Sequence, residues 1–137
     1  MKQSKVFLGG TCADTTWRDE LIYIIQIPYF NPVVVDWTED CQEEERIEKE
    51  EECNVHLYVI TSAMQGVFSI AEVIASAKTA NKITILHIIP EGFDDKQLKS
   101  LDAVADMTIR EGGIAYIDSD IRRTARILNN CFIQDTQ

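Results

Sequence analysis

Two stretches of the sequence are almost continuously apolar, and they constrain the fold more than any other feature. They are Val55–Ile60 (VHLYVI) and Ile83–Ile88 (ITILHI). Strands of this kind are typical of a parallel sheet that helices cover on both faces, whereas a sheet with one face in water shows alternating apolar and polar residues. The two runs therefore favour an α/β fold with a parallel sheet.

Shorter patterns complete this prediction. Further strands are expected at residues 5–8, 32–35 and 114–117, and helices at about 17–26, 42–53, 69–80, 95–111 and 119–132. This βαβαβαβαβ order, joined by right-handed crossovers, predicts a flavodoxin-like doubly wound sheet with strand order 2-1-3-4-5. At 137 residues, the chain is expected to form one domain, 1–137.

The sequence makes more detailed predictions for three of the helices. Thr16 followed by Asp19 predicts a capping box at the start of the first helix. The helix at 42–53 has few apolar residues and is expected to be largely solvated. The helix at 69–80 is apolar around most of its circumference, which predicts a central position.

Charge and composition exclude several classes of protein. The net charge is −10, with much of the acidic excess in residues 39–52, and this field disfavours binding to nucleic acid polymers. A small nucleotide remains compatible with it. No apolar run reaches the roughly 18 to 20 residues that span a bilayer, and the first residues lack the apolar region of a signal peptide. We therefore expect a cytoplasmic protein without a membrane partner.

The four cysteines are widely spaced and include no C-x-x-C pair. Such spacing is typical neither of a zinc site nor of a disulfide framework. We therefore expect reduced thiols, no metal and no cofactor.

The topology predicts where a ligand binds. In such sheets ligands occupy the crevice beyond the carboxyl ends of the strands, near the point where the strand order reverses. The loops expected there are 9–16, 36–40 and 61–69.

The first loop begins Gly9-Gly10-Thr11 and leads into a helix. Its backbone N–H groups are suited to an anion or a sugar hydroxyl, although a tight turn that needs glycine explains it equally. It matches neither the dinucleotide fingerprint nor the P-loop motif.

Glu72 has two interpretations. It lies in the first turn of the helix that follows the third loop, where the helix dipole favours an ionised carboxylate suited to nucleophilic attack. It is also the last residue of a formal capping box that begins at Ser69.

Four more residues near these loops are candidates with structural alternatives. Asp36 offers a proton to a leaving base and Trp37 offers an indole for stacking, or they are a helix cap and a half-buried side chain. Trp17 and Arg18 contact a base or a phosphate, or pack and solvate the helix. His56 and His87 lie inside strands and are expected to be core residues.

Several segments, in this order and spacing, resemble the nucleoside 2-deoxyribosyltransferase-like family. They are KVFLGGTCADTTWRDELI, YFNPVVVDW, EEERIEKEECNVHLYVIT and GVFSIAEVI. The resemblance covers nearly the whole chain and implies a flavodoxin-like domain that cleaves or transfers the N-glycosidic bond of a nucleoside or nucleotide. Glu72 matches the nucleophilic glutamate by position.

The resemblance also implies a homo-oligomer whose neighbouring subunits complete each pocket. Substrate contacts are then expected along the crevice, including Ser62 and Gly66 in the third loop. The chain departs from the family in two places: residues 62–71 contain no aspartate to recognise the base, and Phe7 stands in the region of a tyrosine. Asp36, Thr11 or Ser62 are alternatives for the missing hydroxyl.

These departures leave other functions open. The first is an enzyme, either a transferase or, if water replaces the acceptor base, a hydrolase. The second is a non-catalytic module that binds or sequesters a nucleotide. The third is cleavage of NAD, which involves the same type of bond but lacks a dinucleotide motif here.

Overall fold

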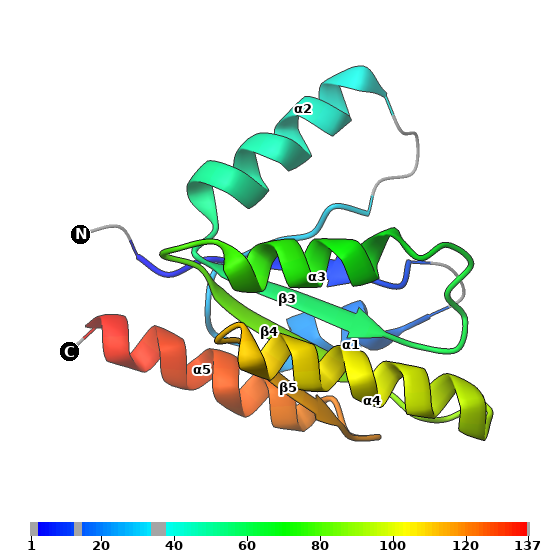
Figure 1. The fold of residues 1–137 in the computed structure, drawn as a ribbon. Coiled ribbons are helices and arrows are strands. Elements are labelled where there is room, and N and C mark those ends of the chain that lie inside the picture. The colour runs from blue at the N-terminus through cyan, green and yellow to red at the C-terminus, as the bar shows by residue number, and fades with distance from the viewer. Residues whose placement is uncertain (1–2, 13–14, 34–37, 137) are drawn as a thin grey trace.

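The sheet has five parallel strands in the order β2-β1-β3-β4-β5, which confirms the predicted topology (Figure 1). The computed structural model describes residues 3–12, 15–33 and 38–136. Within them, the strands are β1 (Val6–Gly10), β2 (Tyr29–Phe30), β3 (Val55–Ile60), β4 (Ile83–Ile88) and β5 (Ile114–Ile117). The helices are α1 (Trp17–Ile24), α2 (Glu39–Ile47), α3 (Phe68–Lys78), α4 (Asp95–Arg110) and α5 (Arg122–Thr136), and the π-helix η1 (Glu48–Glu52) continues α2.

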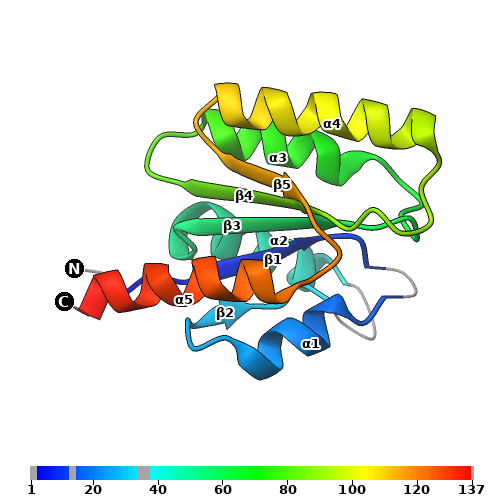
Figure 2. The same cartoon turned by 90° about the horizontal axis from the view of Figure 1, so that it is seen from below.

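Two layers of helices cover the sheet, α3 and α4 on one face and α1 and α5 on the other (Figure 2). Strand β3 shows why its sequence is apolar throughout. Val55, Leu57 and Val59 belong to the core on the α1 and α5 side, whereas Tyr58 and Ile60 belong to the core on the α3 and α4 side. Both faces of the strand are thus buried, as the sequence predicted.

Strand β2 lies earlier in the chain than predicted. It is formed by Tyr29 and Phe30, which pair with Val6 and Phe7 of β1. Pro32 and Val33 are not in the strand, and residues 34–35 of the predicted strand lie outside the described residues. Pro32 has no N–H to donate to a neighbouring strand, and the side chain of Asn31 accepts the Val33 N–H. The prediction of a strand at 32–35 is therefore wrong where it can be compared.

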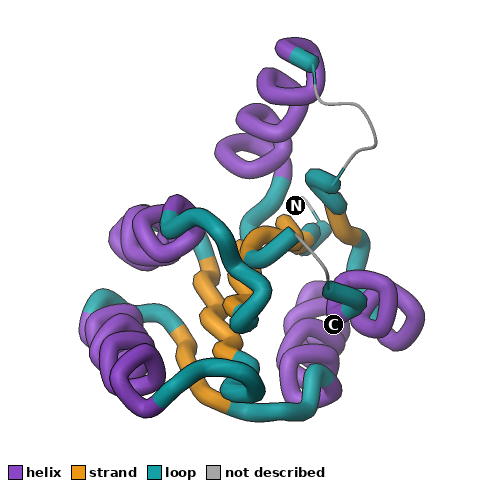
Figure 3. Tube along the Cα trace, turned by 90° about the vertical axis from the view of Figure 1, so that its right-hand side faces the viewer, coloured by secondary structure: helices purple, strands orange, loops and turns teal. Residues whose placement is uncertain are grey.

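Helix α2 begins earlier than predicted, because Thr38 caps it. The Thr38 hydroxyl accepts the backbone N–H of Cys41 at 3.3 Å. None of the residues of α2 or of η1 is buried, so the expectation of a solvated helix is confirmed. The helix stands away from the other helices (Figure 3).

The predicted caps of α1 and α3 are wrong. Thr16 makes no cap hydrogen bond with the helix backbone, and its hydroxyl instead donates to the Glu20 carboxylate at 3.1 Å. Helix α3 begins at Phe68 with Val67 as its N-cap, which places Ser69 inside the helix and removes the capping box. The helix is also not central, because it packs through Val73 and Ser76 and leaves another side open.

Helix α4 agrees closely with the prediction, and α5 begins later than predicted. Asp94 and Gln97 form a capping box at the start of α4, and Gly112 follows its end with a φ of 100°. Before α5, the side chains of Asp118 and Asp120 accept backbone N–H groups two residues ahead. These turns delay the start of the helix to Arg122. Within the described residues, every helix is too short or too polar to cross a membrane.

Candidate active site

The carboxyl end of β1 forms a tight turn that brings the chain against β3. Gly10 has a φ of 110°, and a Cβ at this residue would lie 2.1 Å from the carbonyl oxygen of Val59. The hydroxyl of Thr11 accepts the backbone N–H of Thr61 at 3.0 Å. This links the loops that follow β1 and β3. The turn therefore needs glycine for close packing, whatever else it contacts.

Arg18 stabilises this turn through hydrogen bonds to its backbone. The residue is 6% exposed, and its guanidinium donates to the carbonyl oxygens of Leu8, Gly10 and Thr11. Burial lowers the pKa of Arg18. Most of the guanidinium donors are thus directed at the backbone, and the side chain organises the loop.

Trp17 packs beside Arg18. Its indole is 3% exposed, its N–H donates to the Thr11 carbonyl at 3.0 Å, and the guanidinium of Arg18 lies 4.3 Å from the ring centroid. Of the two alternatives for Trp17, the structure gives it the packing role.

The Glu72 carboxylate pairs with a lysine from another element. Oε2 of Glu72 accepts a hydrogen bond of 2.9 Å from Nζ of Lys49, in η1. The Glu72 side chain is 15% exposed and is not part of the cap of α3. The interpretation of Glu72 as a capping residue is therefore wrong. A charge-assisted hydrogen bond of this kind fixes the position of a carboxylate.

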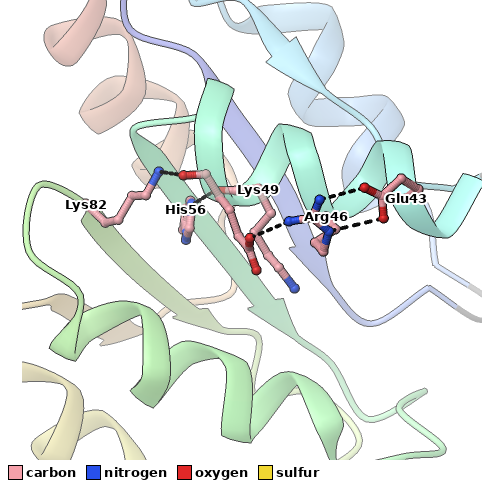
Figure 4. Close-up of polar contacts among 6 residues, drawn as sticks. Glu43, Arg46, Lys49, His56 and Lys82 are labelled. Carbon is pink, nitrogen blue, oxygen red and sulfur yellow. Dashed lines mark hydrogen bonds and ion pairs between the residues drawn. The ribbon is translucent and has the colours of Figure 1, made fainter.

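Contacts with the sheet hold η1, and with it Lys49, in place. Nε2 of His56 in β3 lies 2.6 Å from the carbonyl oxygen of Lys49. Nζ of Lys82 donates to the carbonyl oxygens of Glu50 and Cys53, both at 2.8 Å. Figure 4 shows His56 and Lys82 below the end of this helical segment, from which Lys49 extends. The position of η1 thus depends in part on Lys82, which is 32 residues from Glu50 in the sequence.

A cavity of about 290 Å³ lies at the end of β1, with Glu72 on its wall. The β1 turn contributes Gly9 and Gly10, and α2 contributes Glu45. The remaining residues around it are Phe7, Cys12, Arg18, Pro32, Val33 and Ser69. Its volume is close to the lower limit for pockets that enclose small molecules. The crevice predicted from the topology is therefore present, and two carboxylates line it.

Glu45 is half-buried, and its carboxyl is electrostatically coupled to the other charged groups of the cavity. Burial raises the pKa of Glu45. The positive charges of Lys49 and Arg18 oppose this rise, and the negative charge of Glu72 adds to it. A sequence pattern of acidic residues on a solvated helix does not show which of them faces a pocket.

A second cavity, of about 390 Å³, is lined by both Lys49 and Glu72. Its walls are the open side of α3 and the segment η1, with His56 and Tyr58 of β3 at its base. Phe68, which is 72% exposed, lines this cavity and also a third one of about 240 Å³ that contains Gly66 and Thr11. Glu72 therefore lines both the cavity of about 290 Å³ and the cavity of about 390 Å³.

Both histidines are core residues, as predicted. Burial lowers the pKa of His56 to about 4, so its neutral ring donates Nε2–H to the Lys49 carbonyl and Nδ1 accepts from the Ser76 hydroxyl at 2.8 Å. Burial also lowers the pKa of His87, whose Nδ1 accepts from the Thr124 hydroxyl at 2.7 Å. Each ring thus connects the sheet to a neighbouring segment without carrying charge.

The other predicted site residues fall into three groups. Gly9 and Gly10 line the cavity that contains Glu72. Ser62 is exposed and is not among the residues that line either cavity containing Glu72. Asp36 and Trp37 lie outside the described residues. Among the residues that the structure describes, no group of three or more His, Cys, Asp or Glu side chains is arranged to hold a metal ion.

Glu45 and Lys49 were not among the site residues predicted from the sequence. Both belong to an acidic segment that was expected to be largely solvated, and their one available signal was a spacing of four residues, which places them on the same side of a helix. Cys12, for which the sequence predicted only a reduced thiol, is exposed and lines the same cavity as Glu45.

Comparison with known proteins identifies the family of the chain. No curated protein matches the chain. A family model described as "Nucleoside 2-deoxyribosyltransferase like" matches residues 3–91, more than half of the chain. The matched segment runs from β1 through β4 and includes Gly10, Glu45, Lys49 and Glu72. The chain therefore belongs to the nucleoside 2-deoxyribosyltransferase-like family.

Proposed function

We propose that this protein cleaves or transfers the N-glycosidic bond of a deoxynucleoside or its nucleotide, with Glu72 as the nucleophile. The observation that carries the proposal is the position of the Glu72 carboxylate, which lines a cavity with the Gly9 and Gly10 turn while Lys49 holds one of its oxygens. Family membership supports a nucleoside or nucleotide as the substrate class.

The reaction follows from an ionised carboxylate beside a sugar. A carboxylate oxygen of Glu72 attacks the anomeric carbon, the bond from that carbon to the base nitrogen breaks, and its electron pair leaves with the base. The product is a glycosyl ester on Glu72. Water or a second base then attacks the same carbon and releases the carboxylate. Water gives hydrolysis and a base gives transfer.

The hydrogen bond from Lys49 supports this role by orientation. A nucleophile held within hydrogen-bond distance of a fixed cation presents the same oxygen to each substrate. The carbonyl of Lys49 is itself tied to His56, so the pair does not depend on a flexible side chain alone.

A non-catalytic nucleotide-binding module is the second candidate, and Phe7 is the observation that favours it. The Phe7 ring is 1% exposed and stacks on Phe30 with a centroid distance of 6.0 Å. It supplies no hydroxyl at the position where the family resemblance implies a tyrosine. A protein that lost this hydroxyl and kept the cavity would bind a nucleotide without cleaving it.

Two further parts of the proposal concern the leaving base and the oligomeric state. Asp36 and Trp37 are proposed to meet the leaving base. A homo-oligomer is proposed because Val67 and Phe68, both 72% exposed, offer apolar surface at the start of α3. Light scattering at micromolar concentration tests this, and a fully active monomer would exclude a shared site.

The decisive experiment incubates the protein with nucleosides, deoxynucleosides, their monophosphates and NAD, with and without a free acceptor base, followed by chromatography. Acceptor-dependent exchange identifies a transferase, free sugar without an acceptor identifies a hydrolase, and nicotinamide release identifies cleavage of NAD. Calorimetric binding without product favours the binding module. Absence of both binding and product excludes the nucleoside assignment.

The role of Glu72 is tested with Glu72→Gln and Glu72→Ala, which remove the nucleophilic carboxylate. We expect both variants to lose turnover while remaining folded by circular dichroism. The matched control is Glu44→Gln, since Glu44 is an exposed glutamate of α2. Product formation at the wild-type rate in the Glu72 variants would contradict the proposal.

A further inference from the structure

Among the described residues of α2, Glu45 is the one that lines the cavity containing Glu72. Its neighbours on the helix have other surroundings. Glu43 forms an ion pair with Arg46 at 2.6 Å, and Glu44 is exposed. Glu45 belongs to α2, which stands away from the other helices (Figures 1 and 3), and Glu72 belongs to α3. The two carboxyl groups therefore reach the cavity from different elements.

This arrangement offers a substrate two carboxyl groups in one small volume. The turn at Gly9 and Gly10 lines the same cavity. Retaining glycosyl transfer requires two carboxyl groups flanking the bond that breaks, one as nucleophile and one as acid. The described part of the cavity supplies both groups without Asp36.

The two carboxyl groups have different environments, and one suits an acid and the other a nucleophile. Glu72 accepts a hydrogen bond from Lys49, which orients its carboxylate in the cavity. Burial raises the pKa of Glu45, and the charge of Glu72 adds to the rise against the opposing charges of Lys49 and Arg18. A carboxyl group whose pKa is raised by burial suits the role of the acid, and a carboxylate oriented by a lysine suits that of the nucleophile.

We propose that Glu45 is the acid–base residue that works with Glu72, which rests on the glycosyl transfer proposed above. In the first step, the protonated Glu45 carboxyl gives its proton to a ring nitrogen of the leaving base as the glycosidic bond breaks and the Glu72 ester forms. Glu45 is then an anion. In the second step, it accepts the proton of the attacking water or base while the ester bond to Glu72 breaks, which restores both groups.

The test compares two substrates that differ in their need for a proton. The first is a natural deoxynucleoside, and the second is a 2-deoxyribosyl 4-nitrophenyl glycoside, whose leaving group departs as a stable anion. First-turnover rates isolate the bond-breaking step. We expect Glu45→Gln to slow the deoxynucleoside by about 10²- to 10⁴-fold and the nitrophenyl substrate by less than about tenfold. Glu72→Gln is expected to abolish both reactions.

A second readout follows the base role of Glu45 in the return step. Glu45→Gln is expected to accumulate the glycosyl ester with the nitrophenyl substrate, visible by intact mass. Azide attacks without giving up a proton and is therefore expected to restore turnover. Failure of azide to do so, with no accumulated ester, would contradict the base role.

The controls separate this inference from the proposed function. Glu44→Gln removes one carboxylate of α2 outside the cavity and is expected to keep both rates. Asp36→Asn tests the other candidate acid. Equal loss on both substrates in Glu45→Gln, or a substrate-selective loss in Asp36→Asn alone, would overturn the role of Glu45 and leave Glu72 as the nucleophile. No cleavage of either substrate by the wild-type protein would overturn the proposed function itself.

Discussion

Nζ of Lys49 lies 2.9 Å from Oε2 of Glu72, and this ion pair joins the π-helix η1 to α3. The two side chains are 24% and 15% exposed, so the pair is less screened by water than most ion pairs of the protein surface. Both residues line the cavity of about 390 Å³. The position of the Glu72 carboxylate therefore depends on the position of η1.

Lys49→Met is expected to lower both activity and stability, because it leaves the partly buried Glu72 carboxylate without this cation. A double-mutant cycle with Glu72→Gln in urea should give a coupling free energy of about 1 kcal/mol. Lys99→Met, at an exposed position of α4, is the control and should leave stability unchanged. A coupling of zero would mean that the pair contributes nothing to the folded state.

Arg18→Met is expected to destabilise the fold. It is not expected to change the preference between a deoxynucleoside and its monophosphate. Removing the guanidinium withdraws its N–H donors from the carbonyl groups of Leu8 and Gly10, at a cost of about 2 to 3 kcal/mol in the free energy of unfolding. Chemical denaturation measures this loss. Substrate competition should show the same preference between a deoxynucleoside and its monophosphate as in the wild type. Weaker monophosphate binding at unchanged stability would instead assign Arg18 to the phosphate.

Gly10→Ala and Gly66→Ala should have opposite outcomes. At Gly10 a Cβ meets the Val59 backbone, and φ is 110°, so we expect a loss of more than about 3 kcal/mol or a failure to fold. At Gly66 a Cβ has nothing within 4 Å, so thermal unfolding should be almost unchanged. Similar unfolding temperatures for the two variants would contradict the close approach of β1 to β3.

Stability is expected to fall as the pH is lowered from about 6.5 to about 4. Burial lowers the pKa of His56 to about 4 in the folded protein, whereas an unfolded histidine titrates near 6.5. The unfolded state therefore binds the proton first, and the folded state loses on the order of 2 kcal/mol over this window. Above the window the contribution is complete.

Urea denaturation at a series of pH values measures this effect. His56→Gln retains an N–H donor for the Lys49 carbonyl and should reduce the slope of stability against pH. The remaining slope is expected to come partly from His87, whose pKa burial also lowers. An unchanged slope in His56→Gln would mean that His56 does not titrate differently on folding.

Much of the fold was predictable because its strongest signals are local. The apolar runs of β3 and β4 have the predicted boundaries, since strands buried on both faces need apolar side chains in consecutive positions. The end of α4 before Gly112 follows from the freedom of glycine at a positive φ. The boundaries of β2 and α2 were less accurate, because Asn31 and Thr38 form side-chain hydrogen bonds that redirect the chain.

The sequence by itself determined the parallel α/β fold, its strand order and the position of Glu72 after β3. The tertiary structure alone decided what surrounds Glu72. Lys49 is 23 residues from Glu72, and Lys82, which holds η1 through the Glu50 carbonyl, is 32 residues from Glu50. Periodicity reports which side of a helix is apolar, but the residue that an exposed side chain meets depends on how distant segments pack. For this reason Glu45 and Lys49 read as ordinary charged residues of a solvated helix until the fold placed them at the cavity.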